Sequence, residues 1–223
     1  KKRTYKKKPY KKRNTTSTTT RLKNSVNMGL GFPKMMKATQ KYQQTYVLTC
    51  TSGITSHHQY ILNGLYDTDL TSTGHQPMYF DQYMAIYNHY TVIGCKMTVK
   101  FLPCASNTVP VKVALWQNDD GSIISNDFST LAEQSKSKIA LLSDGGGTKS
   151  TTLDLKWSAK KQFGSGLISN GKFRGNNGAN PEENSIGVIS IQSADNTTTT
   201  NVAVQICLEY VTVYTELKDI GGS

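Results

Sequence analysis

The chain has 223 residues and a formal net charge of +11, and hydrophobic residues make up 36% of it. This composition, with many Gly, Thr and Ser residues, favours one large all-β domain over two small domains. No apolar run reaches the length of a membrane-spanning helix, so we expect no membrane insertion. All 14 basic residues ahead of Asp67 are unopposed by any acid, while the rest of the chain has 12 basic and 15 acidic residues. The excess positive charge therefore belongs to the N-terminal part.

Residues 1–13 read KKRTYKKKPYKKR and include nine basic residues. Like charges repel and little apolar surface is present, so we expect a disordered arm until a polyanion neutralises it. Tyr5 and Tyr10 add rings that can stack on bases. The pattern indicates nucleic-acid contact and also fits a nuclear-localisation signal. The residues expected to bind nucleic acid are Lys1, Lys2, Arg3, Tyr5, Lys6, Lys7, Lys8, Tyr10, Lys11, Lys12, Arg13, Arg21 and Lys23.

The arm leads into a polar linker. Residues 14–20 are Asn, Thr and Ser, and residues 21–41 continue basic, with Gly29, Gly31 and Pro33 interrupting any regular structure. No apolar stretch or cleavage site follows the first basic residues, so we expect no secretory signal. We place the arm and linker at residues 1–41 and a folded body at residues 42–223.

From Tyr42 the chain reads as strands separated by turn-rich loops. Alternation of apolar and polar residues predicts half-buried strands, as in Thr151 to Trp157 and in Ile93 to Phe101, where Lys96 and Lys100 face outward. Residues 186–191 are almost continuously apolar, as expected for a central strand covered on both faces. The eight expected strands are residues 42–50, 59–63, 94–102, 109–117, 139–142, 151–157, 186–191 and 202–214.

A short helix of about three turns is predicted just ahead of the third strand. Phe80, Tyr83, Met84 and Tyr87 follow the i, i+3, i+4, i+7 spacing of one helical stripe. So short a helix is not stable alone, so the stripe must pack against the body. An exposed polar helix between core strands is unusual, and we expect its opposite face to contact a neighbouring subunit. That face consists of Asp81, Gln82, Ala85 and Asn88.

The predicted strands indicate a particular architecture. Long and irregular connections favour a two-sheet sandwich over an up-and-down barrel, whose hairpin loops are short. We therefore predict a single eight-stranded jelly-roll sandwich with a short helix before the third strand and a disordered basic N-terminal arm. The longest connections, residues 63–77, 118–138 and 163–184, are candidates for contacts outside the subunit.

No combination of residues in the body indicates an enzyme. Ser165 lacks the Gly-x-Ser-x-Gly spacing of a nucleophile elbow. Residues 145–149 place glycines ahead of Thr and Lys in the reverse of the phosphate-loop order, and a strand follows them. His57 and His58 are adjacent, so in a strand they point to opposite sides and do not chelate one ion. We expect no catalytic residues, no metal and no cofactor.

We interpret the loop carboxylates and the cysteines as structural residues and not as metal ligands. Two Asp pairs are more typical of solvated loops than of a calcium site. The four cysteines lack metal-ligand spacing, and we expect buried free thiols, which fits a reducing compartment. These residues are Asp67 with Asp69, Asp119 with Asp120, and Cys50, Cys95, Cys104 and Cys207.

Several residues around the short helix are similar to a known family. They are GHQP at 74–77, FDQY at 80–83, Tyr87, Tyr90 and GCKMTVKF at 94–101. This stretch resembles the capsid proteins of circular Rep-encoding single-stranded DNA viruses, the circovirus-like group. The resemblance implies a single jelly roll, a small T=1-like icosahedral shell, an arm that binds single-stranded DNA, and assembly in a host nucleus. The family's arm is often richer in arginine, whereas lysine occupies most basic positions here.

We therefore expect a structural protein of a virion, a capsid subunit that self-assembles and packages single-stranded DNA through its arm. Its partners are then the viral genome, further copies of the chain, a host nuclear import receptor and a cell-surface receptor. One alternative is the capsid protein of a small single-stranded RNA virus or satellite virus. Another is a monomeric nucleic-acid-binding or carbohydrate-binding β-sandwich, which a monomer with full ligand affinity would identify.

Overall fold

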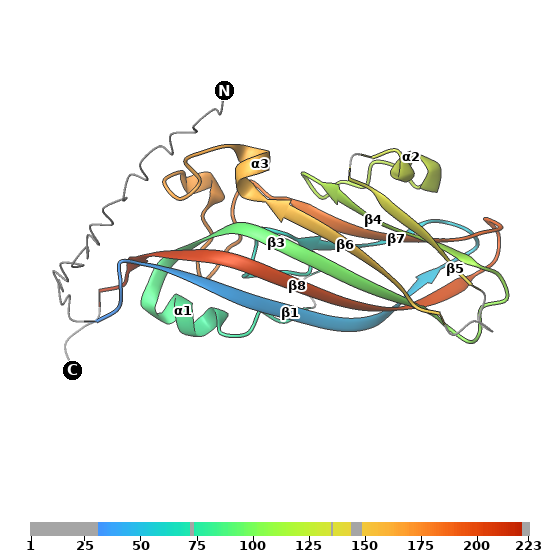
Figure 1. Cartoon of the computed structure of the whole chain (residues 1–223), viewed down its shortest axis with the longest axis horizontal. Coiled ribbons are helices and arrows are strands. Elements are labelled where there is room, and N and C mark those ends of the chain that lie inside the picture. Colours follow the sequence, from blue (N-terminus) through green and yellow to red (C-terminus); the bar gives the residue numbers. More distant parts are fainter. Residues whose placement is uncertain (1–30, 72–73, 135, 144–148, 220–223) are drawn as a thin grey trace, which may run out of the picture. The chain divides into compact units, whose positions relative to one another are not determined.

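The computed structural model describes residues 31–71, 74–134, 136–143 and 149–219 (Figure 1). The chain divides into two units, residues 1–32 and 33–223, and the second contains the folded body. The strands of the described part are β1 (Met35–Cys50), β2 (Ser56–Ile61), β3 (Tyr87–Pro103), β4 (Val111–Asn118), β5 (Lys138–Leu142), β6 (Thr151–Ser158), β7 (Ile186–Ser193) and β8 (Thr200–Leu217). Its helices are α1 (Phe80–Ile86), α2 (Phe128–Ala132), α3 (Ala159–Phe163) and a 3-10 turn, Gly171–Phe173. None of these described helices is long and apolar enough to cross a membrane.

The strands form two four-stranded sheets, with orders β1-β8-β3-β6 and β2-β7-β4-β5 (Figure 1). The antiparallel pairs β4–β5, β3–β6, β2–β7 and β1–β8 are nested within one another along the sequence. The body is thus a long antiparallel hairpin wrapped into two facing sheets, which is the topology of a jelly roll. The predicted all-β fold, a single eight-stranded jelly-roll sandwich with a short helix before the third strand, is confirmed.

The burial of the strands follows the hydrophobic pattern. Every second residue of β8 from Val202 to Tyr210 is buried, so this strand faces the core with one side. All residues of β7 are buried, as predicted for a central strand. Its outer face is covered because Phe128 and Leu131 of α2 pack with Trp116 and Val188.

Tyrosines fill much of the space between the sheets. Tyr90, Tyr210 and Tyr214 are fully buried. A buried tyrosine needs a partner for its hydroxyl group. Tyr210 Oη donates to the Ile61 carbonyl oxygen at 2.7 Å, and Tyr214 Oη donates to the side-chain oxygen of Gln40. The first bond joins the two sheets, because Tyr210 lies on β8 and Ile61 on β2, whereas the second lies between the paired strands β8 and β1.

Most strands differ by a few residues from their predicted bounds, and β1 and β3 differ most. β1 begins at Met35, ahead of the body boundary placed near Lys41. In β3 the register shifts between Val92 and Gly94, so Ile93 is an extra residue in a β-bulge. Val92 is therefore buried, whereas Ile93 is half-exposed. Strict alternation from Ile93 to Phe101 predicts Ile93 on the same face as Cys95, which was wrong because alternation cannot show a bulge.

The cysteines are free, but only two are buried. Cys50 and Cys95 lie in the core, as predicted. Cys104 and Cys207 are half-buried, which corrects the prediction of four buried thiols. Cys104 lies just beyond the end of β3, and Cys207 lies on the outward side of β8.

Candidate assembly and nucleic-acid interfaces

Helix α1 packs its predicted stripe against the sandwich. Phe80 and Met84 are each 1% exposed, and the ring of Phe80 meets that of Tyr90 edge-on at 5.5 Å. Tyr83 is half-buried and stacks on Tyr214, with ring centroids 4.5 Å apart. The helix has seven residues, fewer than predicted, because β3 begins directly after it. Tyr87, the fourth residue of the predicted stripe, therefore lies at the start of β3, where it is also buried.

The predicted assembly residues lie on the outer side of α1 and just beyond it. Asp81, Gln82 and Ala85 are exposed. Asn88 is half-buried on β3 rather than on α1, and its Nδ2 donates to Glu216 Oε1 at 3.4 Å. Three of the four side chains are thus accessible to another subunit, and their part in an interface stays a prediction.

The sequence analysis missed two exposed residues just before α1, of which the second has a strained backbone. Met78 and Tyr79 are 68% and 63% exposed. Tyr79 has φ 70° and ψ 4°, the left-handed conformation, which costs a bulky residue about 1–3 kcal/mol. Hydrogen bonds hold the backbone there, from Met78 N to Lys41 O at 3.4 Å and from Tyr83 N to Tyr79 O at 3.2 Å. The pair lies outside the helical stripe, so no periodicity identifies it.

The GHQP motif, residues 74–77, leads the chain into the turn that precedes α1. A Cβ atom at Gly74 would lie 2.5 Å from Tyr42 Oη and 2.8 Å from Asp69 Cβ, so only glycine fits there. His75 stacks on Tyr42 with ring centroids 4.5 Å apart. The motif therefore has a packing role within the body.

His58 and His57 face opposite sides of β2, as predicted. His58 Nε2 lies 3.0 Å from both carboxylate oxygens of Asp69, which also accepts a hydrogen bond from Thr71 N at 3.0 Å. Burial opposes ionisation of Asp69, but the hydrogen bonds from His58 and Thr71 hold its pKa below its usual value. His57 Nδ1 instead lies 2.9 Å from Ser190 Oγ. The imidazole rings of His57 and His58 therefore have separate partners.

Carboxylates of the described residues take part in local hydrogen bonds. Asp69 pairs with His58, and Asp120 Oδ1 accepts a hydrogen bond from Ser122 N at 2.8 Å. Within the described ranges, no group of three or more His, Cys, Asp or Glu side chains could hold a metal ion. Ser165 lies in the loop after α3, where it lines a surface depression.

Lysines gather on the outer face of the sheet β1-β8-β3-β6, which we call the lysine face. Lys41, Glu209, Lys96 and Lys156 are successive cross-strand partners over all four strands. Lys41 Nζ lies 2.9 Å from Glu209 Oε1. The face carries Lys37, Lys41, Lys96, Lys100 and Lys156 against Glu209 and Asp154. Sequence analysis assigned the positive charge to the arm alone and missed this surface, although the outward direction of Lys96 and Lys100 was predicted.

The arm residues expected to bind nucleic acid, Lys1 to Arg13 with Arg21 and Lys23, lie outside the described residues. Their role stays a prediction. The chain continues from the arm and linker into β1, which is the edge strand of the sheet that bears the lysine face.

No protein-family model matches the chain, and no curated protein matches it. Solved structures give weak matches. A chain of Desmodium yellow mottle tymovirus is 11% identical, with a TM-score of 0.45, over 100% of this chain and 96% of that one. The capsid protein of the BFDV 60-mer is 11% identical, with a TM-score of 0.47, over 86% and 100% of the two chains. A chain of mud crab tombus-like virus is 11% identical, with a TM-score of 0.45, over 86% and 87%. Our fold assignment rests on the strand order itself.

Proposed function

We propose that this chain is a viral capsid protein whose jelly-roll body assembles into a closed icosahedral shell and whose basic arm packages single-stranded DNA. One observation carries the proposal. An acid-free segment with 12 basic residues ahead of Met35 runs into the edge strand of a jelly-roll sheet, and the outer face of that sheet also carries lysines. Arm and lysine face then supply positive charge to the same partner.

The charge distribution suits a shell around a polyanion. The chain beyond the arm and linker is close to neutral overall, so many copies can pack side by side without strong repulsion. The arms remain strongly repulsive until phosphates neutralise them. Nucleic-acid binding therefore promotes the assembly of subunits, and assembly in turn promotes nucleic-acid binding. The choice of single-stranded DNA rests on the resemblance of residues 74–101 to circovirus-like capsid proteins.

The proposal includes two host partners. A basic arm of this kind is a ligand for a nuclear import receptor, which would bring the protein to the host nucleus for assembly. A cell-surface receptor would bind loops that remain outermost on the virion. Fusing residues 1–41 to a fluorescent protein tests the first partner: nuclear accumulation is expected, and an even cellular distribution would contradict it.

Electron microscopy of the expressed full chain is the decisive experiment. We expect uniform closed particles that protect nucleic acid from nuclease. A folded monomer that binds nucleic acid or carbohydrate with full affinity would instead identify a solitary β-sandwich. Nucleic acid recovered from particles made in infected cells should be degraded by DNase. Degradation by RNase alone would favour the RNA-virus or satellite-virus alternative.

A further inference from the structure

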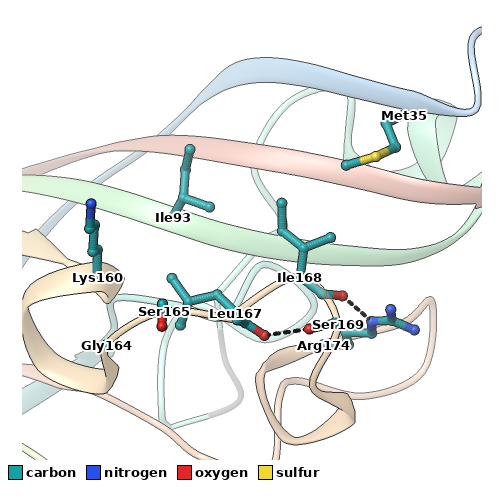
Figure 2. Close-up of a pocket in the computed structure, with 10 residues that line it drawn as sticks. Met35, Ile93, Lys160, Gly164, Ser165, Leu167, Ile168, Ser169 and Arg174 are labelled. Atoms are coloured by element: carbon teal, nitrogen blue, oxygen red, sulfur yellow. Dashed lines mark hydrogen bonds between the residues drawn. The ribbon is translucent and has the colours of Figure 1, made fainter.

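A surface depression of about 520 Å³ lies where the loop after α3 crosses the sheet (Figure 2). Its volume is within the range of binding pockets in proteins. Arg174 Nε donates to the Ile168 carbonyl oxygen at 2.7 Å and so fixes this loop. In Figure 2, Ile168 lies between Ile93 and Met35. We call this the α3 pocket, and its walls include Met35, Ile93, Leu167 and Ile168 with the cations Lys160 and Arg174.

The exposed pair before α1 has the opposite character, because its side chains face solvent instead of lining a depression. Met78 and Tyr79 expose most of their apolar surface, and Asp81 is exposed beside them. We call these three residues the α1 knob. The subunit alone gains nothing from an exposed ring held in a left-handed conformation. Strain of this kind points to a role outside the subunit. Tyr, and to a lesser degree Met, are the residues that protein interfaces favour at their centres.

We propose that the α1 knob of one copy enters the α3 pocket of a neighbouring copy. This inference rests on the proposed capsid function and names the contact that holds neighbours together. The apolar pair matches the apolar wall, and the Asp81 carboxylate matches Lys160 at the rim. Met35 and Ile93 are left partly uncovered in the subunit, as a receiving surface requires.

The knob and the pocket are different surfaces of the subunit, although Met35 of β1 also lines the pocket. Met78 is hydrogen-bonded to β1, the first strand of the order β1-β8-β3-β6, whereas α3 follows directly on β6, the last. Figure 1 shows α1 beside β1 and α3 beyond β6. A contact between two different surfaces of the same chain is heterologous, and it generates a ring when the rotation closes. Rings of this kind are the units from which a closed shell is built.

The Tyr79→Gly variant tests the contact between subunits without disturbing the fold of the subunit. Glycine adopts the left-handed conformation without strain, so the melting temperature should stay within about 4 °C of wild type. Particle yield should fall by about tenfold or more, because a central aromatic anchor is removed. Tyr79→Phe is the matched control, since it keeps both the ring and the strain, and it should assemble normally. Size exclusion, electron microscopy and thermal melts give these readouts.

A charge exchange tests which surfaces meet. Asp81→Lys alone and Lys160→Glu alone should each reduce particle yield, and the double variant should recover it. Both side chains are exposed, so the melting temperatures should not change. Normal yield from Tyr79→Gly, or no recovery in the double variant, would overturn the proposal.

Other occupants of the pocket give different results. If Ile168→Glu abolishes binding of dodecanoate by the monomer but leaves particle yield unchanged, the pocket belongs to a small amphiphile and the proposal is wrong. Failure of the proposed function is distinguishable, because wild-type protein would then form no particles at all. Wild-type particles together with normal Tyr79→Gly particles would refute this interface alone.

Discussion

The His58–Asp69 pair makes stability depend on pH at the scale of single residues. The pKa of Asp69 is lower in the folded protein than its usual value of about 4. Ionised Asp69 therefore stabilises the fold at every pH above that usual value. The contribution disappears as the pH falls through the lower, folded-state pKa.

Asp69→Asn should remove this dependence. We expect it to lower the free energy of unfolding by about 1–3 kcal/mol at neutral pH, because a buried hydrogen-bond partner of His58 is weakened. The difference from wild type, measured by urea unfolding, should shrink as the pH falls from about 5 through the usual Asp pKa of about 4 and below it. Asp119→Asn, in an exposed loop, is the control and should leave the curve unchanged. A constant difference over this range would contradict the assignment.

Phe80 is the residue that fixes α1 to the body. It is 1% exposed, so Phe80→Ala should cost about 3–5 kcal/mol in the free energy of unfolding. A decrease of this size is a large fraction of the stability of a typical domain. Gln82→Ala, on the exposed side of the same helix, should change the melting temperature little. Equal melts for the two variants would show that the helix does not anchor the fold.

Individual buried polar residues explain where sequence patterns fail. Gln40 is only 2% exposed, and the hydroxyl group of Tyr214 donates to its buried side-chain oxygen. A polar residue at an inward position hides the alternation between Met35 and Lys41, so the first half of β1 could not be recognised. Tyr79 could not be found either, because the turn that contains it is held by the bond from Met78 N to Lys41 O, a residue distant in sequence.

At the scale of elements, alternation predicts which side chains face outward but not which strands become neighbours. Lys96 was predicted to face outward, yet its alignment with Lys41 and Lys156 depends on sheet order. Strand order follows from tertiary packing, so the lysine face could not be predicted from local sequence.

The lysine face should contribute to nucleic-acid affinity. In the full chain, the double variant Lys96→Gln with Lys156→Gln should make the slope of log affinity against log salt shallower by about 1.4, because each phosphate left without its lysine reduces it by about 0.7. The control double variant, Lys112→Gln with Lys172→Gln, removes the same charge from positions off this face. Filter binding to a single-stranded oligonucleotide gives both slopes. Equal slopes for the two pairs would mean that only net charge matters.

At the scale of the whole molecule, the fold was predictable because eight apolar patterns and long connections leave few architectures. The alternating strands and the nearly continuous β7 were sufficient to choose a jelly roll. The surfaces proposed for assembly were not predictable in the same way. They include residues outside the strands, such as Met78 and Ile168, whose positions depend on the folded sandwich.

The arm should account for most of the affinity for single strands. If about half of the 14 basic residues ahead of Asp67 contact phosphates, the slope of log affinity against log salt is about −5. Deleting Lys1 to Arg13 removes nine of them, so the slope should fall toward about −2 and affinity at low salt should drop steeply. The melting temperature should not change, because the segment has almost no apolar surface to bury. A full-length variant with nine neutral residues in place of the basic ones serves as the control for chain length, and it should behave like the deletion. Undiminished affinity in either variant would place the nucleic-acid site on the body, where the lysine face is then the surface to test.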